Sequence, residues 1–201
     1  MASDLSRRRL LTLVPAGLAL AALPRAASAL NVDQARDLVG KLVGEINSVI
    51  ASGASEGAMI GKFEGIFTRY ADVNYIAQSA LGPAGRGLPK AQMSAYTKAF
   101  SGYLARKYGR RFREFIGGQI EVTDARPLKS FFEVVSVARL KGQAPFEVRW
   151  HIFDKSGKDR FFNLIIEGVN MLAAERTEIG ALLDRAGGDI GGLTQALASA
   201  G

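Results

Sequence analysis

The chain has 201 residues, with 26 Lys and Arg against 19 Asp and Glu, a net charge of +7, one His and no Cys. The lack of cysteine excludes disulfide bonds, thiol nucleophiles and cysteine-ligated metals. This length suits one domain with a single core. The basic charge favours an anionic membrane surface or an acidic partner, and does not by itself indicate nucleic acid.

Residues 1–29 have the pattern of an export signal. Arginines at 7–9 precede an apolar run over 10–23, and Ala-Ser-Ala at 27–29 forms a small-residue cleavage site. The run is shorter than the roughly 20 residues that span a bilayer, and the arginines resemble a twin-arginine signal. We predict cleavage after Ala29, which leaves residues 30–201 as one domain. The signal holds four basic and one acidic residue, so the remainder carries 22 against 18, a net charge of +4.

The first half of this domain has helical periodicity. Apolar residues three or four positions apart predict one helix over 35–50 and a second from Ser55 to Tyr70. Asp72 is placed to cap a third, short helix that ends at Gly82-Pro83. Pro89 then opens the longest helix, because proline is favoured at the first helical position.

Beyond Gly117-Gly118, which ends the long helix, the period changes from 3.6 to 2. Strands are predicted over 118–124, 129–140, 145–153 and 160–166, with Phe162, Leu164 and Ile166 on one side of the last and a hairpin turn at 154–157. A helix over about 176–186 and a short tail helix follow. Helices followed by consecutive antiparallel strands predict an α+β domain in which the helices cover one face of the sheet.

No catalytic constellation is found in the sequence. The single histidine, His151, falls on the polar side of an alternating strand, where an exposed or hydrogen-bonded side chain is the usual arrangement. Metal-ligand spacings, a phosphate-binding loop and a nucleophile elbow are all missing. We therefore predict no catalytic residue, no metal and no cofactor. An enzyme would need His151 or Glu167 to point into an interior cavity.

Basic residues gather at the end of the long helix: Arg106, Lys107, Arg110, Arg111 and Arg113. Cations near a helix C-terminus are favoured by the helix dipole, so this cluster is explained by a solvated face. The functional alternative is contact with anionic lipid headgroups or with an acidic docking partner.

Aromatic residues recur along the helical stripes, and packing in a filled core is their usual role. A curved sheet closed by helices can also leave a cavity lined by such residues. The periodicity does not separate the two arrangements. The stripes contain Phe63, Phe67, Tyr70, Phe100, Tyr103, Tyr108 and Phe112.

Four segments resemble one protein family in their order along the chain. "EGVNM" (167–171) is similar to its Glu-Gly-Val-Ser-Met signature, and "ERTEIGALLDRAGGDIGGLTQAL" (175–197) resembles its tail. "FTRYADVNYIAQSALG" (67–82) and "AYTKAFSGYLARKYGRRFREFIGGQIEV" (95–122) resemble its earlier helices and the passage into the sheet. This is the MlaC family, also called the toluene-tolerance family, of periplasmic phospholipid-binding proteins of the Mla lipid transport system.

The resemblance implies a fold and a function. The fold is a nuclear-transport-factor-like or cystatin-like curved antiparallel sheet covered by N-terminal helices, with an apolar pocket between the layers. The function is a periplasmic carrier that binds phospholipid acyl chains and makes transient contact with membranes. Its partners are an outer-membrane lipoprotein complex and an inner-membrane MCE-domain ABC transporter, with no nucleic acid.

On this fold we expect the lipid to contact thirteen apolar residues of the helices and the sheet. The alternatives are a carrier of another lipid, such as a hopanoid, or a periplasmic interaction module without cargo. The expected lining is Phe63, Phe67, Tyr70, Ile76, Leu81, Phe100, Tyr103, Leu104, Val148, Trp150, Leu164, Ile166 and Val169.

Overall fold

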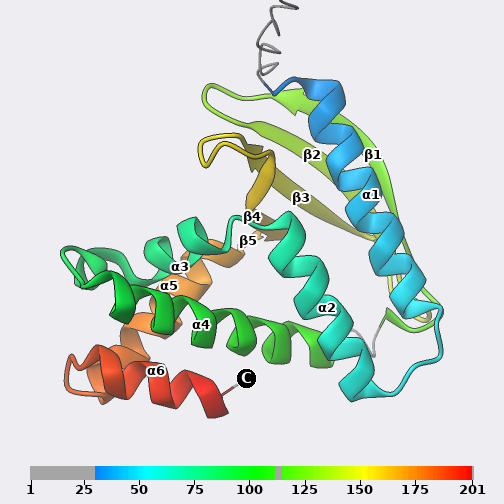
Figure 1. Ribbon diagram of the computed structural model, residues 1–201. Helices are drawn as coiled ribbons and strands as arrows, with labels where there is room; N and C mark the ends of the chain where they lie inside the picture. Colours follow the sequence, from blue (N-terminus) through cyan, green and yellow to red (C-terminus); the bar gives the residue numbers. More distant parts are fainter. Residues whose placement is uncertain (1–29, 112–114, 201) are drawn as a thin grey trace, which may run out of the picture.

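The computed structural model (Figure 1) describes residues 30–111 and 115–200, apart from the side chains of Arg110 and Arg111. The predicted export signal, residues 1–29, lies outside the described residues, as does Arg113 of the basic cluster. The elements, in chain order, are α1 (Val32–Ile50), α2 (Glu56–Tyr70), α3 (Val73–Leu81), a 3-10 helix (Gly82–Gly85), α4 (Lys90–Arg111), β1 (Gln119–Pro127), β2 (Phe132–Arg139), β3 (Phe146–Phe153), β4 (Arg160–Ile166), β5 (Val169–Asn170), α5 (Met171–Arg185) and α6 (Ile190–Ser199).

Side-chain caps set the helix boundaries. The Asp72 carboxylate accepts a hydrogen bond of 3.0 Å from the Tyr75 amide, which starts α3 where the sequence predicts. Helix α5 begins at Met171, five residues before the predicted start, because the side chain of Asn170 accepts from the Ala173 amide at 3.1 Å. The apolar residues at 171–174 therefore belong to helix α5.

The five strands form one antiparallel sheet in the order β1-β2-β3-β4-β5, which is curved and unclosed. This confirms the predicted α+β class. An irregularity in the register between His151 and Ile152 shifts the alternation of β4. As a result Phe161 packs against Trp150, with ring centroids 5.6 Å apart, while Phe162 contacts Phe131. Phe162 nevertheless lines the same apolar cavity as Leu164 and Ile166, with which the sequence grouped it.

Glu167 and Gly168 form the tight turn between β4 and β5. Both have left-handed backbone conformations, with φ of 49° and 81°, and the flanking residues Ile166 and Val169 pair with each other. Two-residue hairpin loops favour residues in the left-handed backbone conformation, because the twist of such a turn matches the twist of the flanking strands. The turn explains why a carboxylate and a glycine interrupt an otherwise apolar segment.

The helices contact the sheet from two regions (Figure 1). Helix α1 lies along β1 and β2, and α3 and α5 contact β4. The Asn47 side chain of α1 pairs with the backbone of Ile120 in β1, donating to its carbonyl at 2.9 Å and accepting from its amide at 3.0 Å. Among the described residues, no helix combines the length and apolar character needed to cross a membrane.

Candidate functional site

An apolar cavity of about 130 Å³ lies where the helices meet β3 and β4. Helices α1 to α5 all contribute to its wall, so residues from most of the chain converge on it. Such concave apolar sites are the usual places where proteins bind small molecules. The lining residues are Leu42, Ile46, Phe63, Ile66, Phe67, Ile76, Leu104, Ala105, Tyr108, Gly109, Trp150, Phe161, Phe162, Asn163, Leu164, Ile166, Met171, Leu172 and Glu175.

Several residues expected to contact lipid lie in this wall. They come from three helices and two strands, and their role in binding stays a prediction. The expected residues that line the cavity are Phe63, Phe67, Ile76, Leu104, Trp150, Leu164 and Ile166.

The other expected residues lie elsewhere. Phe100 and Tyr103 are fully buried in a run of rings along α4, and Tyr70 donates a 2.8 Å hydrogen bond to Glu45. Leu81 and Val148 are buried in the core without lining the cavity. Val169 is 55% exposed in β5.

Most polar groups in the wall are turned to partners within the protein. The Trp150 indole donates to the Ser136 hydroxyl at 2.8 Å. The Asn163 carbonyl oxygen accepts from the amides of Leu164 and Leu172, at 2.9 and 3.1 Å. Because these groups are satisfied, the cavity presents mainly hydrocarbon, and hydrocarbon is the ligand that it favours.

The cavity volume sets what fits without rearrangement. A comparable apolar cavity of about 150 Å³ in another protein binds benzene. A space of about 130 Å³ therefore accepts a fragment of that size. A longer chain requires the side chains of the wall to move apart.

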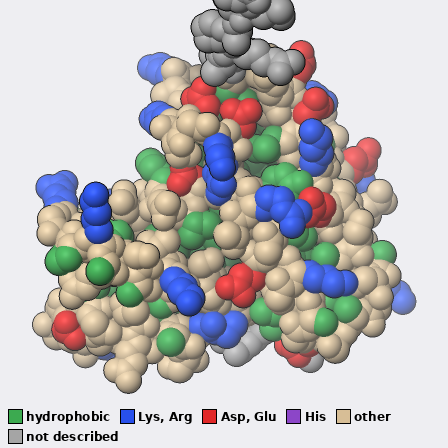
Figure 2. Space-filling model, in the orientation of Figure 1, with side chains coloured by type: hydrophobic (Ala, Val, Ile, Leu, Met, Phe, Trp, Pro, Cys, Tyr) green, Lys and Arg blue, Asp and Glu red, His purple; other side chains and the backbone are tan. Residues whose placement is uncertain are grey.

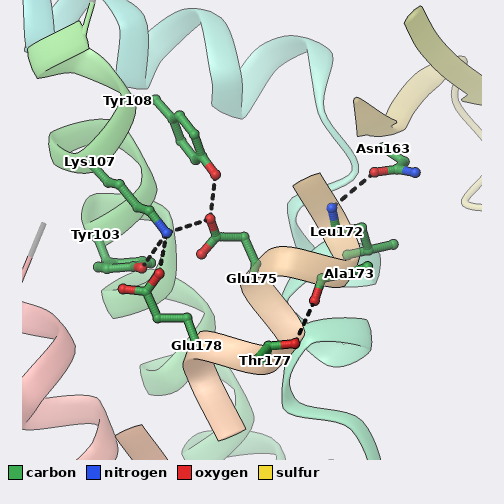
Figure 3. A network of polar contacts seen from close by, with 9 residues as sticks. All are labelled: Tyr103, Lys107, Tyr108, Asn163, Leu172, Ala173, Glu175, Thr177 and Glu178. Atoms are coloured by element: carbon green, nitrogen blue, oxygen red, sulfur yellow. Dashed lines mark hydrogen bonds and ion pairs between the residues drawn. The ribbon is translucent and has the colours of Figure 1, made fainter. Parts of the chain in front are cut away.

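A polar network joins α4 to α5 beside the cavity (Figure 3). The Lys107 ammonium donates to the Tyr103 hydroxyl at 3.0 Å, to Glu175 Oε1 at 2.8 Å and to Glu178. The Tyr108 hydroxyl also donates to Glu175 Oε1. These side chains tie the two helices together across one wall of the cavity.

The contacts of the network shift the pKa values of Lys107, Glu178 and Tyr103. Burial lowers the pKa of Lys107, but hydrogen bonds and charges from Glu175 and Glu178 outweigh it, so the pKa is raised. The hydrogen bond from Lys107 lowers the pKa of Glu178. Burial is the main cause that raises the pKa of Tyr103, which stays neutral.

The described members of the basic cluster make contacts within the chain. Arg106 donates to the carbonyls of Leu197 and Ala200 at the end of α6, at 2.6 and 2.8 Å, and Lys107 belongs to the network. On the face shown in Figure 2, basic side chains are spread out and interspersed with acidic ones. Contact of the cluster with headgroups or a partner stays a prediction.

His151 and Glu167 lie apart from the cavity. His151 is buried, with its Nε2 3.2 Å from a Glu133 carboxylate oxygen and its ring against Phe131. Glu167 is exposed in its turn. Neither His151 nor Glu167 lines the cavity. The described residues include no group of three or more His, Asp or Glu arranged to hold a metal.

The pKa of His151 is expected to shape the acid stability of the protein. Burial is the main cause of its shift and lowers this pKa below 6.5, against the pull of Glu133. The unfolded chain therefore binds the proton first, and the contribution of His151 to stability, complete above pH 6.5, is lost as pH falls through and below that value. The slope reaches at most about 1.4 kcal/mol per pH unit.

The measurement is a chemical-denaturation series from pH 7.5 to 5, alongside an NMR titration of the only histidine in the chain. His151→Gln is expected to flatten the pH dependence in this range. A titration midpoint at or above 6.5 would contradict the expectation.

Sequence patterns missed several lining residues for identifiable reasons. Phe161 entered the wall because the register irregularity between β3 and β4 shifts its position relative to Trp150 and Ile152. Glu175 lies before the predicted start of the last long helix. Its spacing with Met171, Leu172 and Ile179, at intervals of three and four residues, carried the signal, since it places a carboxylate within an apolar stripe.

Comparisons with known proteins agree with this architecture. A solved structure, described as the phospholipid-binding protein from Ralstonia solanacearum in complex with a phospholipid, matches with a TM-score of 0.69 at 16% identity. The match covers 81% of this chain and 94% of that one, and it shows that the two share a fold. The family model described as "MlaC protein" matches residues 37–199. The chain therefore belongs to the MlaC family.

Proposed function

We propose that this chain is a periplasmic carrier that holds the acyl chains of a phospholipid in its apolar cavity and moves the lipid between membranes. Membership of the MlaC family supports this proposal, as does the shared fold with a protein whose structure contains a phospholipid. The observation that carries it is the apolar cavity between five helices and the sheet.

A carrier of this kind works by exchange between two dry environments. Each methylene group removed from water gains roughly 0.8 kcal/mol, so exposing two chains of about 16 carbons costs on the order of 25 kcal/mol. A hydrocarbon-lined cavity removes most of this cost. The cavity volume of about 130 Å³ is too small for a whole acyl chain. Loading therefore requires the side chains of the cavity wall to move apart.

Binding of this kind needs no catalytic group, and we propose that the protein is not an enzyme. The headgroup is left near the surface, and the partners at either end are an outer-membrane lipoprotein complex and an inner-membrane MCE-domain ABC transporter. The export signal predicted at residues 1–29 supports a periplasmic location.

The test is lipid uptake by the purified protein. Trp150 is the only tryptophan and it lines the cavity, so its fluorescence reports on cargo that enters. We expect phospholipid vesicles to change this fluorescence, and mass spectrometry of the re-isolated protein to find about one lipid per chain. Protein that carries no lipid and transfers none between vesicles would refute the proposal.

A further inference from the structure

Glu175 combines three properties that no other lining residue shares as a set. It is the one carboxylate among the described lining residues, its side chain is only 3% exposed, and one of its oxygens has no hydrogen-bond partner. Oε1 accepts from both Lys107 and Tyr108, whereas Oε2 accepts from no group. Figure 3 shows this carboxylate between α4 and α5.

A buried acceptor without a partner is unfavourable, because it has lost its water without replacement. The missing partner must be a hydrogen-bond donor. Ester carbonyls and ionised phosphodiesters offer only acceptors, so the acyl and phosphate parts of a lipid cannot supply it. A hydroxyl or an N–H group can.

We propose that Glu175 is a specificity-determining residue, whose Oε2 accepts a hydrogen bond from a hydroxyl or N–H group of the cargo once the cavity widens. The inference rests on the proposed function, since it places the cargo in the same cavity. The favoured ligand is an amphiphile with a donor group next to its hydrocarbon chain.

Of the two donors, the neutral hydroxyl fits better. Lys107 already lies 2.8 Å from Glu175 Oε1, and an ammonium beside Oε2 would meet the repulsion of this cation. Glu178 offsets part of that repulsion, as it also contacts Lys107. The geometry therefore ranks an alcohol above an amine of the same chain length.

The experiment compares three probes with the same hydrocarbon chain: hexadecanol, its methyl ether and hexadecylamine. Binding to the purified protein is followed through Trp150 fluorescence. We expect the alcohol to bind about tenfold more tightly than the ether, the gain of a hydrogen bond to a charged acceptor. The amine is expected to fall between them. An amine that binds most tightly would identify N–H as the source of the donor.

Two substitutions at the site and one beside it assign the effect. Glu175→Leu removes the acceptor and is expected to equalise the affinities for alcohol and ether. Glu175→Gln keeps the size and one acceptor oxygen, and should retain part of the preference even if the leucine variant folds poorly. Glu178→Gln alters the same network outside the cavity wall and should leave the preference intact.

The outcomes separate this inference from the proposed function. Equal affinities for alcohol and ether in the unaltered protein would overturn the role of Glu175 and leave the carrier intact. A preference that survives in Glu175→Leu would overturn it as well. Failure of all three probes to bind, together with no uptake of phospholipid, would overturn the proposed function and this inference with it.

Discussion

Replacing Leu164 with glutamate is expected to abolish lipid uptake, whereas the same change at Val169 leaves it intact. Leu164 lines the cavity on β4, so a carboxylate there meets the hydrocarbon chain of the cargo. Val169, five residues further along the same hairpin, is 55% exposed and outside the wall. Both variants add one negative charge. The measurement is the amount of phospholipid bound after incubation with vesicles.

The comparison needs proof that the variants fold. Far-ultraviolet circular dichroism should give the same spectrum for both and for the unaltered protein. Ala105→Phe offers a second route, because it fills the cavity from α4 without adding charge and is expected to reduce uptake equally. Full lipid retention in both Leu164→Glu and Ala105→Phe would show that the lipid binds elsewhere.

Lys107→Met is expected to lower the free energy of unfolding by about 2 kcal/mol, because it leaves the Glu175 carboxylate buried without its cation. The Lys107 side chain is 28% exposed and that of Glu175 is 3% exposed, so solvent replaces little of the lost contact. For a domain of this size the melting temperature should fall by roughly 4–8 °C. Thermal and urea denaturation at pH 7 measure both quantities.

An exposed ion pair provides the matched control. Arg139 and Glu121 lie 3.8 Å apart with side chains 56% and 61% exposed, and Arg139→Met should change stability by less than ~0.5 kcal/mol. A second comparison is the double variant Lys107→Met with Glu175→Leu, which removes both buried charges. It should recover much of the free energy of unfolding that Lys107→Met alone loses. If Lys107→Met were as mild as Arg139→Met, the network would not stabilise the fold.

The fold followed from local signals that act over a few residues. Asp72 begins α3 and Gly82 ends it, and each was identifiable from its residue type and place. The alternation of β3 sets Val148, Trp150 and Ile152 at every second position, and all three are buried. Such signals are strong because backbone hydrogen bonding and side-chain periodicity act within one element.

Which residues line the cavity depends on contacts between different helices and strands, and the periodicity of a single element does not predict such contacts. The aromatic stripe of α4 divided between two roles, as Phe100 became buried helix packing while Tyr108 reached the cavity wall. The exposure of Val169 followed from a turn that needs Glu167 in a left-handed conformation. Lys107, expected to face solvent or a headgroup, contacts acids of a helix about seventy residues later in the chain. Each outcome was decided by a partner distant in sequence.

The contact of Asn47 with β1 bears on how the molecule behaves at high concentration. As a terminal strand of nine residues, β1 leaves a row of backbone groups able to recruit a strand from a neighbouring copy. The Asn47 amide occupies the donor and the acceptor of Ile120 on that row. The register irregularity between Val122 and Asp124 and the proline that ends the strand interrupt it further. The β1 edge of the open sheet is thereby shielded from pairing with a second copy, by the first helix and by the irregularities of the strand itself.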